Sequence, residues 1–479
     1  IYTGEDTLSL HDALPIFEAG DSAPAEALLR ADETALTPAD RPPSPAERRA
    51  AADLARQQGA LLIGQDTTTA LAAYQRAASY DPDDTWTRFF LGDLYKALGQ
   101  LNDALQAYRE ARASVDRRLT KDAQDADAQR DLSVSHERIG DVLLAQGDGP
   151  AALAAYRAGL AIRETLARRD SANTQWQRDL SVSHNKIGDV LLVQGDGPAA
   201  LDAYRAGLAI AETLARRDPA NTQWQRDLSV SHNRIGDVLR AQGDGPTALV
   251  AYRAGLAIAE TLARRDPANT DWQRDLTVSH NKIGDVLLAQ GDGPAALATY
   301  RAGLAIRETL ARCDPANTEW QRDLFVSHTK IGNVLRAQGD GPAALAAYRA
   351  GLAIAETLAP RDPANTEWQR DLSVSHGKIG DVLLAQGDGP AALAAYRADL
   401  AIAETLARRD PGNAQWQVDL AASCGRLGTT SALPVAERRA FLLRGRDILK
   451  QIKAAGRLAP AQDWIGEFDA ELAKLPAAN

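Results

Sequence analysis

Apolar residues recur at helical spacing over most of the chain, in paired stretches separated by a short polar turn. In one copy of this pattern the turn is Gly243–Pro246 (sequence GDGP). The stripe before it consists of Trp224, Leu228, His232, Ile235 and Leu239, and the stripe after it of Leu249, Tyr252, Leu256 and Leu262. Successive intervals of mostly three or four residues place each set on one face of a helix. The pattern predicts two antiparallel helices per copy and an all-α protein.

This helix pair returns with a period of 48 residues. The same glycine therefore occurs six times, at Gly140, Gly188, Gly236, Gly284, Gly332 and Gly380. A single pair cannot cover its own apolar face, so a fixed period of this size predicts a stacked array in which each copy packs on its neighbours. Such an array offers one long surface for binding.

The ends of each copy carry helix-boundary signals. Thr222 followed three residues later by Gln225 predicts a capping box at the start of the first helix. Pro246 suits the first position of the second helix, and Pro267 ends it. In a later copy Asp399 stands where five earlier copies have glycine. This departure predicts looser packing, and a gain in stability from Asp399→Gly.

The spacing of small and aromatic residues resembles that of the tetratricopeptide repeat. One short copy shows it at Leu91, Gly92, Tyr95, Gly99, Ala104, Tyr108 and Ala111, and the preceding half-copy at Ala70, Tyr74, Ala77 and Pro82. The 48-residue copies keep it, as at Ile187, Gly188, Leu191, Gly195, Ala200, Tyr204 and Gly207. The resemblance implies a right-handed α-solenoid of stacked helix-turn-helix units. Two departures, His184 in the family's Trp position and a proline displaced to Pro219, indicate longer helices than the standard repeat.

The chain is expected to divide into five segments. Residues 1–16 resemble a translated sequencing adapter, and because the chain contains no methionine we expect a fragment without its natural N-terminus. The composition of the next segment, acidic and rich in Pro and Ala, predicts a disordered linker. The segments are 1–16 (adapter), 17–44 (linker), 45–121 (two shorter repeat units), 122–429 (48-residue repeats) and 430–479 (a C-terminal helical cap with helices at about 434–456 and 460–475).

Composition narrows the class of partner. The formal net charge is −10, from 54 Lys and Arg against 64 Asp and Glu, which argues against nucleic acid. No apolar run approaches the roughly 20 residues that a membrane helix needs. The two cysteines, Cys313 and Cys424, share no motif spacing, which favours a reducing compartment and a cytoplasmic location.

Several repeated polar residues could suggest a metal site, a catalytic site or a phosphate-binding loop. Six copies of one histidine (His136, His184, His232, His280, His328 and His376) lie in different units, and adjacent helices about 8–10 Å apart are too distant for two rings to share a zinc ion. In DLSVSH, Ser183 and His184 are helical neighbours that point in different directions. The GDGP turn lacks the N–H groups of a phosphate loop, since Asp196 repels anions and Pro198 has no donor. The sequence predicts no metal, no cofactor and no enzymatic activity.

The polar face of the first helices is the predicted binding surface. The resemblance implies a concave groove lined by these helices, and a ladder of Asn side chains resembles that of kinesin-light-chain-type repeats. Aspartates in this groove would add negative potential, and they stand where a carboxylate clamp for chaperone tails needs Asn. The alternative is that these residues are merely solvated. The predicted groove residues are Arg178, Asn185, Asp189, Arg226, Asn233, Asp237, Arg240, Asn281, Asp285 and Arg336.

Three functions remain open from the sequence. The first is a non-catalytic scaffold that binds an extended peptide or a protein surface in the groove. The second is the sensing or autoinhibitory region of a signalling enzyme whose catalytic domain preceded Phe17. The third is self-association of the array through its near-identical units.

Overall fold

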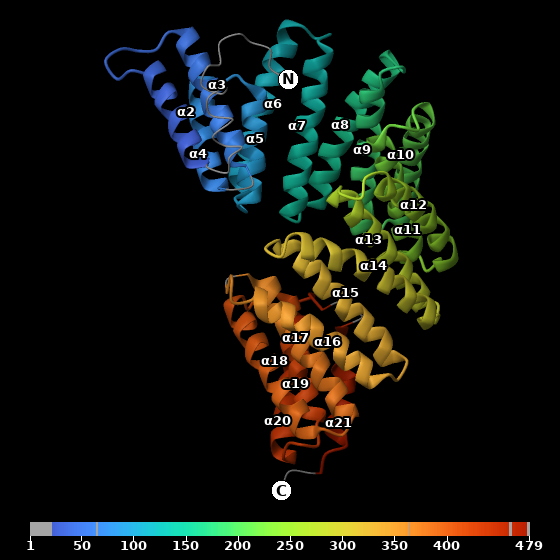
Figure 1. Ribbon diagram of the computed structural model, residues 1–479. Coiled ribbons are helices and arrows are strands. Elements are labelled where there is room, and N and C mark those ends of the chain that lie inside the picture. Colours follow the sequence, from blue (N-terminus) through green and yellow to red (C-terminus); the bar gives the residue numbers. More distant parts are fainter. Residues whose placement is uncertain (1–21, 64–65, 364, 459–461, 477–479) are drawn as a thin grey trace. The chain divides into compact units, whose positions relative to one another are not determined.

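The computed structural model describes residues 22–63, 66–363, 365–458 and 462–476 (Figure 1). All regular elements in these ranges are helices. The chain forms two compact units, Ile1–Gly243 and Asp244–Asn479. The adapter-like residues 1–16 lie outside the described ranges.

The first unit contains ten helices within its described residues. They are α2 (Ser22–Leu36), α3 (Pro45–Leu62), α4 (Thr67–Tyr80), α5 (Thr85–Ala97), α6 (Leu101–Lys121), α7 (Ala126–Ala145), α8 (Gly149–Arg169), α9 (Thr174–Val193), α10 (Gly197–Arg217) and α11 (Thr222–Ala241). Consecutive helices from α2 to α11 pack on each other, and α9 also contacts α11. The first unit is thus a stack of helix hairpins.

The second unit repeats this arrangement in its described residues. Its helices are α12 (Gly245–Arg265), α13 (Thr270–Ala289), α14 (Gly293–Cys313), α15 (Thr318–Ala337), α16 (Gly341–Leu358), α17 (Thr366–Ala385), α18 (Gly389–Arg409), α19 (Ala414–Thr429), α20 (Val435–Ala454) and α21 (Ile465–Ala473). Consecutive helices again pack on each other. The predicted all-α architecture of stacked helix-turn-helix units is confirmed.

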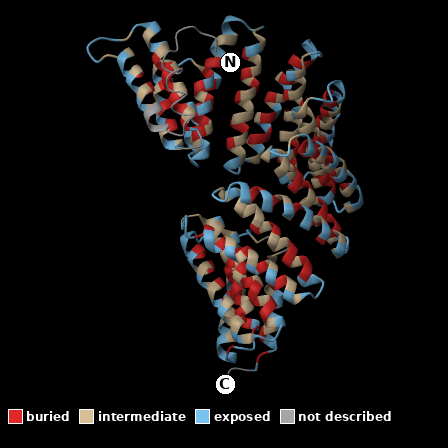
Figure 2. Ribbon diagram, viewed as in Figure 1, coloured by how far each residue is buried: buried red, intermediate tan, exposed pale blue. Residues whose placement is uncertain are grey.

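The repeated glycine sets the distance between the two helices of a pair. A β-carbon on Gly188 of α9 would lie 2.6 Å from the ring of Tyr204 on α10, and Tyr204 itself is only 1% exposed. Glycine therefore lets α9 and α10 approach until the tyrosine ring lies against the backbone. The same contact recurs at Gly140–Tyr156, Gly284–Tyr300, Gly332–Tyr348 and Gly380–Tyr396. Buried residues accordingly follow the faces where helices meet (Figure 2).

The start of each long first helix differs from the prediction. The cap of α11 is Asn221, whose side chain accepts a hydrogen bond from the backbone N–H of Trp224 at 3.1 Å. The predicted capping box of Thr222 and Gln225 is wrong, because Thr222 is already helical and Gln225 donates to the carbonyl of Ala215. Asparagine is a stronger cap than threonine, so the cap lies one residue earlier.

The predicted linker 17–44 is also wrong over much of its length, because residues 22–36 form α2. Leu29 is 1% exposed and packs on Leu54 of α3. Glu33, 3% exposed, is held by Arg76 of α4 at 2.8 Å. Burial against α3 and this ion pair make helix favourable for a segment whose composition alone indicates disorder.

At the other end, the two expected terminal helices are present as α20 and α21. Phe468 of α21 is 5% exposed and belongs to a core cluster with Val418, Leu442 and Leu449. Its ring faces Gly445, where a β-carbon would lie 2.5 Å away. Together α20 and α21 cover the apolar face of α19.

Candidate functional site

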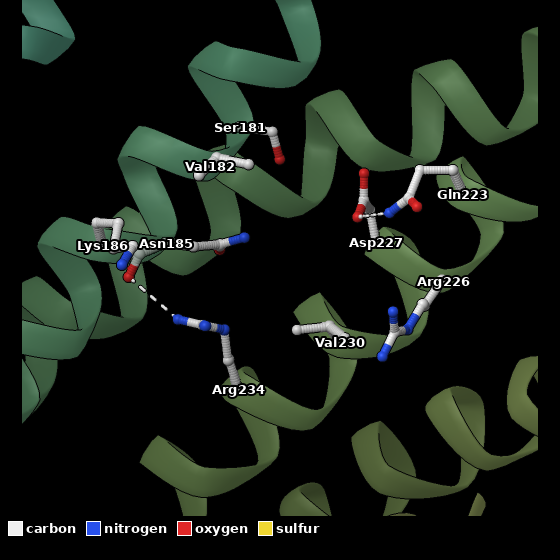
Figure 3. A pocket seen from close by; sticks show the side chains of 9 residues that line it. All are labelled: Ser181, Val182, Asn185, Lys186, Gln223, Arg226, Asp227, Val230 and Arg234. Atoms are coloured by element: carbon white, nitrogen blue, oxygen red, sulfur yellow. Dashed lines mark hydrogen bonds between the residues drawn. The ribbon is translucent and has the colours of Figure 1, made fainter. Parts of the chain in front are cut away.

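A pocket opens between the first helices of two successive repeats in the first unit. It has a volume of about 210 Å³ and lies between α9 and α11 (Figure 3). Its lining residues are Ser181, Val182, Asn185, Lys186, Gln223, Arg226, Asp227, Val230 and Arg234. Two of the predicted groove residues, Asn185 and Arg226, therefore meet in one pocket.

Asn185 is the polar centre of this pocket. Its Oδ1 is buried and accepts no hydrogen bond from the described residues. The oxygen is close to α10, since a β-carbon on Gly207 would lie 2.9 Å from it. Figure 3 shows the Asn185 side chain extending into the pocket. The glycine on the second helix thus lets the Asn185 carbonyl lie close to α10, and the amide nitrogen is left as a donor on the pocket side.

Apolar and cationic side chains surround the asparagine. Val182 and Val230 supply apolar surface from the two facing helices. Arg234 donates to the backbone carbonyl of Asn185 at 3.4 Å. Lys186 is bound to Asp141 of the preceding repeat at 2.7 Å. An amide donor beside apolar walls can hold an extended backbone and one apolar side chain of a ligand.

The predicted acidic residues have a different role from the expected one. Asp189 accepts a hydrogen bond from Tyr204 at 2.7 Å and is paired with Arg234 of the next repeat. Burial, followed by this carboxylate, raises the pKa of Tyr204, so its hydroxyl stays protonated and donates. The cation cancels the negative potential that the sequence analysis assigned to Asp189.

The same network occurs around Asp285 in the second unit. Asp285 accepts from Tyr300 at 2.5 Å and is paired with Lys330 at 2.6 Å. Equivalent tyrosine-to-acid hydrogen bonds join Tyr108 to Asp93, Tyr156 to Asp141 and Tyr396 to Asp381. These aspartates connect the two helices of one repeat to the first helix of the next.

The predicted arginines also connect repeats. Arg178 of α9 binds Asp227 of α11 through two hydrogen bonds, of 2.5 and 3.3 Å. Arg336 lies 3.4 Å from Asp381, one repeat further along the second unit. Arg240 is exposed near the end of α11. Arg178 and Arg336 are therefore engaged within the protein.

The remaining predicted residues are half-buried on the same helix faces. Asn233 and Asp237 lie on α11, and Asn281 lies on α13. With its oxygen turned toward α14, the Asn281 amide accepts hydrogen bonds from Nη1 and Nη2 of Arg307, both at 2.9 Å. Sequence reasoning missed Arg307, Lys186 and Arg234. For Lys186 and Arg234 the available signal was the Lys or Arg that follows the asparagine position in every long repeat.

The repeated histidines are half-buried between helices. Burial lowers the pKa of His184, and it does the same for the equivalent histidine in the other long repeats. Within the described residues no group of three or more His, Cys, Asp or Glu could hold a metal ion. None of the helices described is long and apolar enough to cross a membrane.

The structure consists of helix hairpins stacked within each of two units, with a pocket between α9 and α11 in the first unit. Residues 61–130 match the family model described as tetratricopeptide repeat. The match includes most of the residues on which the sequence resemblance was based, so the resemblance is confirmed. This repeat fold is typical of protein-interaction scaffolds. No curated protein matches the chain.

Solved structures with related helical arrays cover different shares of the chain. A signal-transduction ATPase with numerous domains and a tetratricopeptide repeat sensor, from Pyrococcus horikoshii, is 10% identical with a TM-score of 0.48, over 85% of this chain and 53% of that one. The apo form of RapI is 13% identical with a TM-score of 0.42, over 63% of this chain and 97% of that one. A third structure contains the nearly identical TPR-like repeats of a putative kinesin light chain from Podospora anserina. It is 15% identical to this chain with a TM-score of 0.37, over 48% of this chain and 98% of that one. Scores this low say nothing about function.

Proposed function

We propose that this protein is a non-catalytic scaffold that binds an extended peptide segment of a partner protein along the faces of its first helices. The observation that carries the proposal is the pocket at Asn185. Its Oδ1 is buried without a hydrogen-bond partner among the described residues, and the side chain extends toward open space between α9 and α11. The oxygen lies against α10, so the amide nitrogen is the group on the pocket side, where it can donate to a carbonyl of a ligand.

The lining chemistry favours a peptide over a small charged metabolite. Charged groups at the pocket are already bonded to other repeats, as Lys186 is to Asp141 and Asp227 is to Arg178. A ligand in the pocket would therefore contact mainly the amide of Asn185 and the apolar surface of Val182 and Val230. An amide donor beside a small apolar recess matches the backbone and a side chain of an extended peptide.

To test this, peptides that bind the protein are selected from a displayed library of random 12-residue peptides, and their affinities for variants are measured. Asn185→Thr should weaken selected peptides at least tenfold, because it removes the amide. The fold should tolerate this change, since Thr329 stands at the same place three repeats later. Val182→Trp should block the pocket, and Trp86 already occupies the corresponding position in a short repeat, where it is 45% exposed.

The control is Asp202→Ala on the exposed side of α10, a position where other repeats carry Ala154 and Ala298. This variant should bind like the wild type. Equal affinity of Asn185→Thr, Val182→Trp and wild type for the selected peptides would refute the site. The alternative function, a sensing region of a larger signalling enzyme, uses the same groove and is tested by determining the complete reading frame.

A further inference from the structure

Two buried arginines occupy the same position in different repeats. They are Arg163 on α8 and Arg307 on α14, which are 5% and 4% exposed. The other long repeats have alanine at this position, at Ala211, Ala259, Ala355 and Ala403. The arginine is therefore dispensable for the repeat fold, and a specific reason is needed for each buried charge.

Arg163 is fully satisfied. Its Nη2 lies 2.6 Å from the carboxylate of Glu137 on the first helix of the same repeat. Its Nε donates to Ser133 at 3.1 Å, and its Nη1 donates to Ser183 at 2.7 Å. The charge is balanced, and every nitrogen has a partner.

Arg307 has the same position without the same partners. Asn281 stands where the other repeat has Glu137, so a neutral amide faces the guanidinium. Thr277 replaces Ser133, and the Nε of Arg307 is buried without a partner among the described residues, whereas the Nε of Arg163 donates to Ser133.

No carboxylate of the described residues forms an ion pair with Arg307. Its Nη1 donates to Ser327 at 2.5 Å, which satisfies a nitrogen but supplies no charge. Asp323 is close enough for its charge to act on Arg307, but it is bonded to Arg274 at 3.2 Å. Burial accordingly lowers the pKa of Arg307. A buried charge without a counterion is costly, so an added anion would be strongly stabilising.

Asn281 connects this charge to the groove. Its oxygen accepts from both Nη atoms of Arg307, so its NH₂ group is directed away from the arginine. Asn281 is half-buried and shares a helix face with Val278, which is 38% exposed. The amide thus presents a donor at the surface with a positive charge directly behind it.

We propose that Asn281 and Arg307 form an anion subsite in the groove of the second unit, which takes the carboxylate of an Asp or Glu residue of the bound peptide. The ligand carboxylate accepts from the Asn281 amide and supplies the negative charge that Glu137 supplies to Arg163. This subsite rests on the proposed peptide-binding function and adds to it a preference for acidic residues at one position.

The experiment compares peptides selected from the random 12-residue library by the wild type, by Arg307→Ala and by Arg163→Ala. Wild type should enrich Asp and Glu severalfold at one position, and Arg307→Ala should lose this enrichment while still selecting peptides. Arg163→Ala should keep it, because Glu137 already neutralises that arginine. Asn281→Glu is a second variant, which should also abolish the enrichment and raise the melting temperature by recreating the Glu137–Arg163 pair.

Equal acidic enrichment by wild type, Arg307→Ala and Asn281→Glu would overturn the subsite, and so would its absence in wild type. Selection of peptides without acidic preference refutes the subsite alone, whereas failure to select any peptide refutes the proposed function. In that case titration with N-acetyl-aspartate methylamide still decides the subsite. In NMR spectra, the side-chain amide signals of Asn281 should shift with this probe and not with N-acetyl-asparagine methylamide. Equal shifts with the two probes would overturn the subsite.

Discussion

The carboxylate of Asp399 on α18 occupies the space that Gly377 on α17 leaves open. A β-carbon on Gly377 would lie 3.1 Å from Oδ2 of Asp399. Asp399 is 2% exposed, accepts from Ser423 at 2.9 Å and is paired with Arg426 at 2.9 Å. In other repeats the arrangement is reversed, with a side chain such as Asn185 facing a glycine such as Gly207. The looser packing expected from the sequence at Asp399 is therefore wrong.

Asp399→Gly should lower the free energy of unfolding by about 2–4 kcal/mol, because it removes the buried carboxylate that pairs with Arg426 and accepts hydrogen bonds from Ser373 and Ser423. Gly377→Asn alone should also destabilise, by overlap with Asp399 and Arg426. The double variant recreates the Asn185–Gly207 arrangement and should be more stable than either single variant. Denaturant midpoints of the four proteins measure this, and strictly additive losses would contradict the coupling.

Gly188→Ala should destabilise the first unit by about 1–3 kcal/mol, because the new methyl group would overlap the buried ring of Tyr204. Thermal melting measures the loss. The additional change Tyr204→Leu should recover part of it by removing the ring. Gly466 is the control, since no atom lies within 4 Å of a β-carbon there, and Gly466→Ala should be neutral or slightly stabilising.

The Arg178–Asp227 pair should contribute about 1 kcal/mol to the contact between α9 and α11, since it is bidentate but partly exposed. A double-mutant cycle with Arg178→Ala and Asp227→Ala, followed by chemical denaturation, measures the coupling. High salt should reduce it. A coupling energy of zero at low salt would show that the ion pair does not stabilise the contact between α9 and α11.

Lowering the pH from 7.5 to 5 should destabilise the protein through its half-buried histidines. Burial lowers the pKa of His184 and His232 in the folded state, so folding favours their neutral form. Stability from this source is present above the unfolded pKa of about 6.5 and is lost as the pH falls toward the folded value. His184→Gln with His232→Gln should reduce the difference in melting temperature between the two pH values. An unchanged difference would exclude these histidines as its source.

The two cysteines should react at very different rates. Cys313 is exposed, whereas Cys424 is buried and burial raises the pKa of its thiol to about 11. At pH 8 a thiol reagent should label Cys313 rapidly and Cys424 only on unfolding. Mass spectrometry of Cys313→Ser should therefore show almost no labelling of the native protein, and rapid labelling of this variant would contradict the burial of Cys424.

Local pattern in the sequence was enough for the helices and their pairing. Helical spacing of apolar residues, the GDGP turns and the 48-residue period each depend on neighbours in the chain, so they predicted the stacked hairpins directly. Gly188 and Tyr204 were also recognisable, because their close contact is a local property of one hairpin. The composition wrongly predicted a disordered linker where α2 forms, because burial of Leu29 against another helix decides the conformation there.

The roles of the polar residues were decided only by the tertiary structure. Asp189, Asp227 and Arg307 meet partners roughly 15–50 residues away, and no rule of local spacing states which of two nearby cations an acid will bind. Electrostatic pairing depends on distance and burial in three dimensions. The sequence by itself therefore determined a repeated helical array with a polar face, and the packing of one repeat on the next decided which polar groups bond to each other.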